Sequence, residues 1–133
     1  MSKHLSLISL IALVTAPTAY SQSDEDILEK VRVSATKTFL EQASWTLPQS
    51  FHNSGLAPSE KKRLVEQWAN ASATCLADAL ATYAISTDVP LSEMVSDDGS
   101  FSLKGGSRSE YDLFLTTCIE SAWESVGASH GYD

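Results

Sequence analysis

Histidine is scarce in this sequence, where the 133 residues include only His4, His52 and His130. No His-Glu-x-x-His, Gly-x-Ser-x-Gly or phosphate-loop motif is present. A serine or cysteine nucleophile needs a positioned base, and His52 and His130 fall in a predicted loop and in the C-terminal tail. The sequence therefore predicts that the protein is not an enzyme and has no cofactor and no metal site.

Basic residues are also few. Nine Lys and Arg stand against seventeen Asp and Glu, which gives a formal net charge of -8. Loss of Lys3 with an N-terminal leader would leave 8 − 17 = −9. Nucleic acids and anionic membranes attract positive charge, so neither is expected as a partner. A charged surface that keeps the protein soluble explains this acidity without any basic partner.

Long apolar runs are absent except at residues 5–14, near the N-terminus. Lys3 and His4 precede this run, and Ala19 and Ser21 place small residues at the two positions that a signal peptidase reads. A membrane anchor is the alternative, but a spanning helix needs about 20 apolar residues. We expect residues 1–21 to be a signal peptide cleaved after Ser21. Residues 22–133 would then be a single helical domain, periplasmic or secreted, with no stable membrane insertion after signal cleavage.

The sequence has only two cysteines, Cys75 and Cys118. In an exported chain this number points to one disulfide. There is no Cys-x-x-Cys, and no histidine lies at ligand spacing from either cysteine, which argues against a redox pair or a zinc site. We predict a Cys75–Cys118 disulfide between two helices.

Prolines and glycines are few, and they separate three helical patterns. The first begins at Ser23 and ends before Pro48, with apolar residues at steps of three and four. The second covers residues 58–85. The third covers residues 107–126, with a capping box at its start and Gly127 placed to end it. Residues 47–55 have the composition of a loop, and residues 86–106 favour a short helical turn and a small hairpin. The predicted fold is all-α, a small bundle of three main helices plus a short extra helix, stapled by one disulfide.

Two tryptophans are informative about packing. Trp68 lies seven residues before Cys75, so both point the same way and Trp68 is expected in the core. Trp123 lies five residues after Cys118, about 140° round the helix, and cannot face the second helix if Cys118 does. It either packs with Leu115 and Ile119 on the first helix, around Val31, Ala35 and Phe39, or is exposed beside Glu120 and Glu124. An exposed tryptophan with an acidic rim is typical of a binding hot spot.

Loops carry binding residues more often than helix faces do, and residues 88–104 form the longest predicted loop. Asp97 and Asp98 in this loop suit a turn, since the EF-hand spacing for calcium is absent. We expect the loop, with Asp97, Asp98 and Phe101, to be the main contact to any partner. An exposed Trp123 on the third helix is the alternative site.

Two functions of different classes fit these patterns. The first is a protein-binding module, an inhibitor or immunity-like protein whose partner is another envelope or secreted protein. The alternative is a periplasmic stress chaperone or envelope-maintenance factor, which exposes apolar surface when conditions change. In kind, the chain resembles small periplasmic helical proteins with one disulfide, such as immunity proteins against peptidoglycan-degrading toxins and acid-stress chaperones. No motif extends either resemblance to particular residues.

Overall fold

The computed structural model describes residues 22–129. The predicted signal peptide and the cleavage point after Ser21 lie outside the described residues. Within this range no helix combines the length and the apolar character needed to span a membrane.

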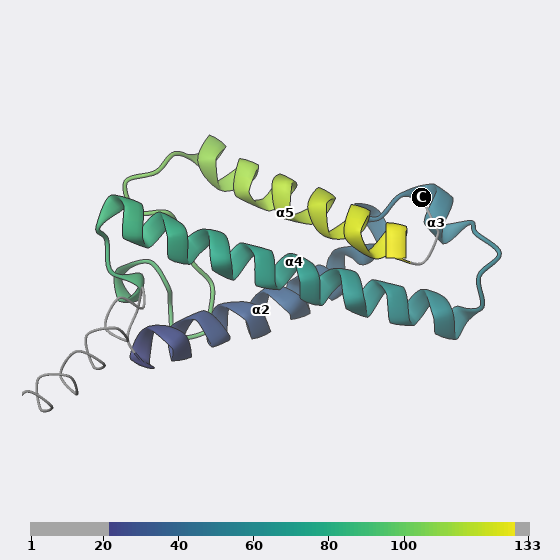
Figure 1. The fold of residues 1–133 in the computed structure, drawn as a ribbon, viewed down its shortest axis with the longest axis horizontal. Coiled ribbons are helices and arrows are strands. Elements are labelled where there is room, and N and C mark those ends of the chain that lie inside the picture. Colours follow the sequence, from purple (N-terminus) through teal and green to yellow (C-terminus); the bar gives the residue numbers. More distant parts are fainter. Residues whose placement is uncertain (1–21, 130–133) are drawn as a thin grey trace, which may run out of the picture.

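The described chain is an all-α bundle of three long helices and a short one, with one disulfide. In chain order the elements are α2 (Gln22–Thr46), α3 (Gln49–His52), α4 (Pro58–Thr87), the 3-10 turn η1 (Leu91–Glu93) and α5 (Arg108–Ser129). Figure 1 shows α4 running through the middle, with α5 along one side of it and α2 along the other. The fold class predicted from the sequence is therefore confirmed.

The helix ends follow local chemistry. At the start of α5 the Ser107 amide donates to Glu110 Oε1 at 2.9 Å, and the Glu110 amide donates to Ser107 Oγ at 3.1 Å. This is the reciprocal capping box expected from the sequence. Ala57 precedes α4 and makes no side-chain cap. The first residue of the helix is Pro58, which suits that position because the amide that proline lacks would have no partner in the helix anyway. At the other end of α4, Asp88 adopts the left-handed conformation with φ 59.

Two local predictions are wrong. Residues 47–55 are predicted as a loop but contain the single helical turn α3. Pro48 both ends the previous helix and caps this turn, where its carbonyl oxygen accepts a hydrogen bond from the Phe51 amide at 3.0 Å. Gly127, predicted to end the last helix, lies inside α5, which continues to Ser129. Gly127 is buried, so tertiary packing outweighs its weak helix propensity at this position.

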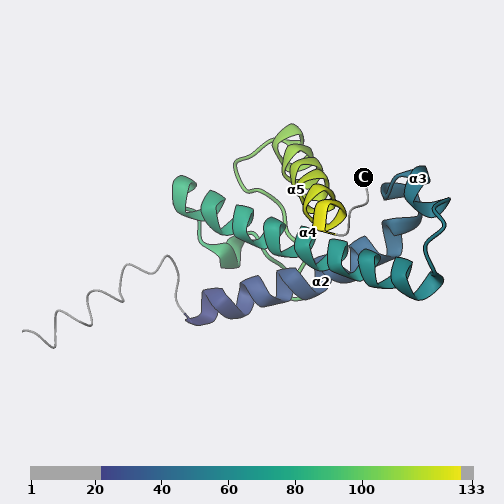
Figure 2. The same ribbon diagram turned by 45° about the vertical axis from the view of Figure 1, so that its right-hand side comes forward.

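α4 is the element on which the others pack. Both α2 and α5 pack along it, and they pack little against each other; Figure 2 shows them on different sides of α4. Four buried alanines of α4 recur every four residues, and each belongs to a core cluster that includes residues of α2: Ala69, Ala73, Ala77 and Ala81. Small side chains at this spacing let two helix backbones come close together.

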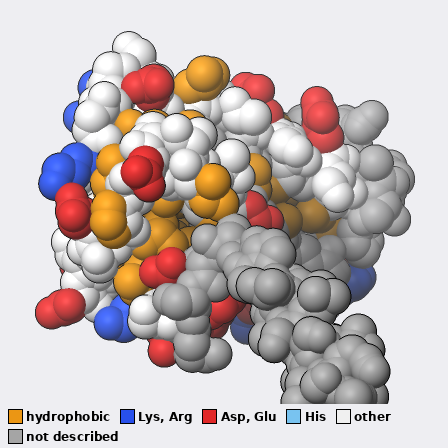
Figure 3. All heavy atoms as spheres, turned by 60° about the vertical axis from the view of Figure 1, so that its left-hand side comes forward, with side chains coloured by type: hydrophobic (Ala, Val, Ile, Leu, Met, Phe, Trp, Pro, Cys, Tyr) orange, Lys and Arg blue, Asp and Glu red, His pale blue; other side chains and the backbone are white. Residues whose placement is uncertain are grey.

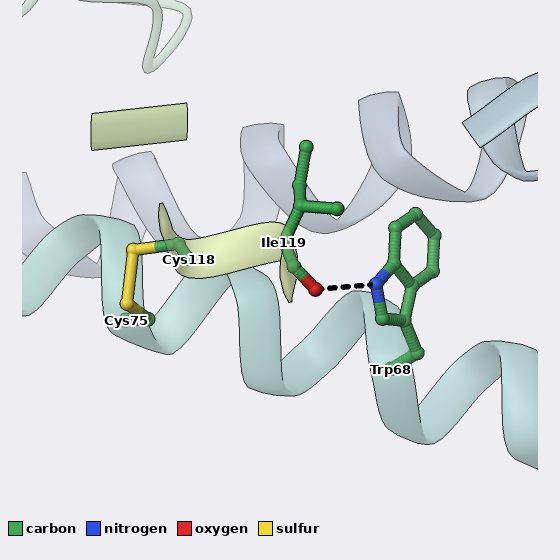
Figure 4. Close-up of a disulfide and its surroundings, with 4 residues drawn as sticks. All are labelled: Trp68, Cys75, Cys118 and Ile119. Carbon is green, nitrogen blue, oxygen red and sulfur yellow. Dashed lines mark hydrogen bonds between the residues drawn. A yellow bond between two sulfur atoms is a disulfide. The ribbon is translucent and has the colours of Figure 1, made fainter. Parts of the chain in front are cut away.

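The disulfide joins α4 to α5 near their middles. Cys75 and Cys118 are bonded with their Cα atoms 5.6 Å apart, which confirms the predicted pairing. Trp68 is 0% exposed and its Nε1 donates to the backbone oxygen of Ile119 at 3.4 Å, so a second tie lies next to the covalent one (Figure 4). The predicted core position of Trp68 is also confirmed.

The segment between α4 and α5 forms η1 and a small hairpin, as predicted. An antiparallel bridge pairs Val95 with Phe101, and the Ser96 amide donates to the Ser100 oxygen at 2.8 Å. Gly99 at the tip has φ 90, and a Cβ atom there would lie 2.8 Å from Ser34 Cβ and nearer still to the Lys30 carbonyl oxygen. The hairpin tip therefore rests directly on the backbone of α2.

Candidate functional site

The two predicted acidic residues lie on the hairpin, and both are exposed. Asp98 Oδ1 accepts hydrogen bonds from the Ser100 amide at 3.0 Å and from Ser100 Oγ at 2.7 Å. These donors stabilise the carboxylate and lower the pKa of Asp98 below its ordinary value of 3.8. Asp98 thus closes the hairpin turn, whereas Asp97 makes no hydrogen bond within the described part of the chain.

Phe101 and Trp123 are both partly buried. The Phe101 ring packs against Tyr111 of α5, with centroids 5.5 Å apart. Trp123 packs edge-on against Phe51 of α3, with centroids 5.2 Å apart. One neighbour of Trp123 is therefore the short helix α3, which the predicted placement on the first helix did not include. Asp97, Asp98 and Phe101 lie together on the hairpin, but Trp123 lies at the α3 end of the molecule.

A cleft lies between α2 and α5. We call it the α2–α5 groove, and its volume is about 220 Å³. Its walls are Ser34, Ala35, Thr38 and Gln42 from α2 and Tyr111, Leu115 and Ile119 from α5. Phe39 and Leu76 lie beneath, and the hairpin residues Gly99, Ser100 and Phe101 close one end. Leu115 and Ile119 therefore face α2, as predicted, and Trp123 packs against the core cluster that includes Phe39 of α2.

No charged side chain lines the α2–α5 groove. The charge lies elsewhere on α5, which has four carboxylates, Glu110, Asp112, Glu120 and Glu124, and a single basic residue, Arg108. Arg108 already pairs with Asp112 at 3.4 Å. Glu120 and Glu124 are exposed and form no ion pair with any described residue. The groove is thus uncharged inside, with apolar and polar lining side chains in similar measure, and the helix α5 beside it is acidic.

Trp45 is a residue that the sequence reasoning missed. Its side chain is 72% exposed near the end of α2. It lies three residues after Gln42 and seven after Thr38, so helical geometry places it on the groove side of α2. The signal was present in the sequence, because Trp45 follows the buried Ala43 by two residues, a rotation of about 200° away from the core stripe.

A second hollow of about 300 Å³ lies where α4 ends, between Asp24 of α2 and the residues around η1. Its apolar walls include Ala81, Ile85 and Leu91. Figure 3 shows this end of the molecule, where apolar side chains gather and Asp and Glu side chains border them. Among residues 22–129 no three His, Cys, Asp or Glu side chains converge in a way that could hold a metal ion.

Comparisons with protein-family models, with curated proteins and with solved structures found no match. The functional argument therefore depends on the geometry and chemistry of the chain itself.

Proposed function

We propose that this chain is a protein-binding module that works in an oxidising compartment outside the cytoplasm. There it binds another envelope or secreted protein, as an inhibitor or immunity-like protein does. The Cys75–Cys118 disulfide supports this location, since disulfides form and persist where the surroundings are oxidising. The signal-peptide pattern of residues 1–21 supplies the route of export.

The observation that carries the proposal is the α2–α5 groove with Trp45 exposed beside it. Apolar surface rimmed by polar residues marks interaction sites on soluble proteins. Tryptophan is enriched among the residues that contribute most to binding energy. The hairpin residues Asp97 and Asp98 directly precede Gly99, which lines the groove, and they remain part of the proposed contact surface.

The test is affinity capture from an envelope extract with the immobilised mature protein, starting at Gln22. The groove variant is Thr38→Arg, which places a bulky cation on the wall of the groove. The matched control is Thr74→Arg on α4, where Thr74 is exposed and lines a shallow hollow outside the groove. We expect the wild type and Thr74→Arg to capture the same small set of proteins and Thr38→Arg to lose them.

Two results would contradict the proposal. If no protein is enriched over a blank matrix, the chain is not a binding module of this kind. If all three proteins capture the same set, binding does not involve the groove. The chaperone alternative has its own signature, because it predicts that a hydrophobic dye binds on mild acidification while the disulfide stays intact.

A further inference from the structure

We infer that the α2–α5 groove receives an amphipathic helix of the partner protein, with Lys or Arg along the flank that faces α5. This inference rests on the proposed function and specifies the partner of the same site.

The first argument is the geometry of the walls. α2 and α5 each pack on α4 and pack little against each other, and the groove lies between them. The groove residues of α5, Tyr111, Leu115 and Ile119, recur every four residues, and so do Ser34, Thr38 and Gln42 on α2. Ridges at this spacing interdigitate with the ridges of another helix. A helix from outside can therefore pack as α2 and α5 themselves pack on α4.

The second argument excludes other occupants. An extended peptide binds by adding a strand to a sheet edge, but both walls are helices whose backbone groups are already hydrogen-bonded, and the described residues contain no strand. A small ligand fits poorly, because such sites usually measure about 300–1,000 Å³ and carry a few convergent polar groups. The groove measures about 220 Å³ and is lined by no charged side chain.

The third argument is charge. Asp112, Glu120 and Glu124 each follow by one residue a side chain that points toward the groove or α3, so they lie about 100° further round α5. Asp112 comes nearest the groove, about 20° past Ile119 round the helix, whereas Glu120 and Glu124 lie about 100° and 140° past Ile119 and point to solvent. The α2 edge carries both Lys37 and Glu41, so the net bias comes from α5. A second copy of this chain is disfavoured, because each copy has a net charge of -8.

The fourth argument is the asymmetry of the two ends. The hairpin closes one end of the groove through Gly99 and Phe101. Beyond Gln42 the groove side of α2 continues to the exposed Trp45. The partner helix therefore lies over Thr38 and Gln42 and extends toward Trp45, which packs on its apolar face.

The inference is tested with a displayed library of peptides of about 18 residues, which is five helical turns. Each position carries Ala, Leu, Ser, Lys or Glu, and the library is selected on the mature protein. We expect the enriched peptides to carry Leu at steps of three and four and Lys along one flank. They should bind Thr74→Arg like the wild type and bind Thr38→Arg or Gln42→Lys about tenfold more weakly or worse, the loss of one well-packed contact.

A charge-reversal pair separates the flank from a general effect of net charge. Asp112→Lys with Glu120→Lys, the two α5 carboxylates nearest the groove, should weaken the Lys-bearing peptides most at low salt. Glu66→Lys with Asp78→Lys, two exposed residues of α4, makes the same change in net charge and should have little effect. Circular dichroism checks that each variant is folded, and the Gln42→Lys variant replaces Thr38→Arg if that protein does not fold.

Enriched peptides with alternating apolar residues, equal binding to the groove variants, or no enrichment at all would overturn the inference. An envelope protein that is captured through the groove but is not displaced by helical peptides overturns it too, and leaves the proposed function standing. If neither peptides nor envelope proteins bind, both proposals fail.

Discussion

Trp68 lies in the larger core cluster and links the three long helices. It is fully buried, its ring lies edge-on to Phe39 of α2 with centroids 5.7 Å apart, and its indole donates to Ile119 of α5. One side chain therefore contacts all three long helices. Tryptophan suits this position because it combines a large apolar area with one polar group that must find a partner when buried.

Replacement of Trp68 by Ala should lower the free energy of unfolding by about 3–5 kcal/mol, through a cavity and a lost hydrogen bond. Trp45→Ala is the matched control, and its effect should stay within about 0.5 kcal/mol because Trp45 is 72% exposed. Urea denaturation measures both. A loss below about 1 kcal/mol for Trp68→Ala would show that the site is not a packed core.

Asp98 should make stability depend on pH in a defined direction. Its hydrogen bonds with Ser100 lower its pKa in the folded protein below 3.8, the ordinary value. The carboxylate therefore contributes stability above pH of about 3.8, and the contribution is lost as the pH falls through the lowered folded value. Asp98→Ala should lower the urea midpoint at neutral pH and have a smaller effect well below pH 3.

Asp97→Ala is the control for this measurement, since Asp97 has no such hydrogen bond to lose in the described structure. A destabilisation by Asp98→Ala that is the same at both pH values would show that the turn does not depend on the ionised carboxylate.

At the scale of elements, the hairpin is held on α2 by close approach. Gly99 is buried at its tip, and the space that a Cβ atom would need is occupied by the backbone at Lys30 and by Ser34. The hairpin in turn positions Phe101 at the end of the α2–α5 groove. The shape of the candidate site therefore depends on one glycine.

Gly99→Ala should destabilise the protein more than Gly105→Ala does. Both glycines have positive φ, 90 and 83, so both substitutions strain the backbone by roughly 1 kcal/mol. Only at position 99 would the added Cβ atom also clash, since nothing lies within 4 Å at Gly105. We expect a further loss of about 1–3 kcal/mol and faster amide exchange in the hairpin. Equal losses for the two variants would mean that the tip does not rest on α2.

At the scale of the whole molecule, the disulfide compensates for the open arrangement of the helices. Each of α2 and α5 has one long neighbour, α4, so less apolar area is buried between helices than in a closed bundle. The disulfide holds α5 on α4 and closes a loop with a sequence separation of 43. In the chain-entropy model this contributes about 4 kcal/mol by restricting the unfolded chain.

Reduction of the Cys75–Cys118 disulfide should therefore lower the melting temperature by more than about 15 °C, since about 1 kcal/mol moves a domain of this size by roughly 4–8 °C. A thermal melt with and without reductant measures the shift. The Cys75→Ala, Cys118→Ala double variant should melt near the reduced wild type and not respond to reductant. Free thiols in the oxidised, folded protein would contradict the pairing.

The sequence by itself determined the features that depend on neighbouring residues or on counting. The capping box at Ser107, the start of α4 at Pro58 and the turn at Asp98 are local, because a few consecutive residues satisfy each other's hydrogen bonds. The disulfide followed from there being two cysteines, and the burial of Trp68 followed from its sharing a helix face with Cys75. Helical periodicity also predicts that the Trp45 side chain points away from the core.

Only the tertiary structure decided which faces meet. Helical periodicity predicts the direction in which Trp123 points, but it does not predict that α3 forms and that its Phe51 packs against Trp123. Composition assigns Phe101 to an exposed loop, but the hairpin folds onto α2 and partly buries it. The sequence likewise does not show that α2 and α5 leave a groove between them. The physical reason is that hydrophobic burial is non-directional, so an apolar stripe requires a neighbour without specifying which one, and the disulfide and the buried alanines of α4 make that choice.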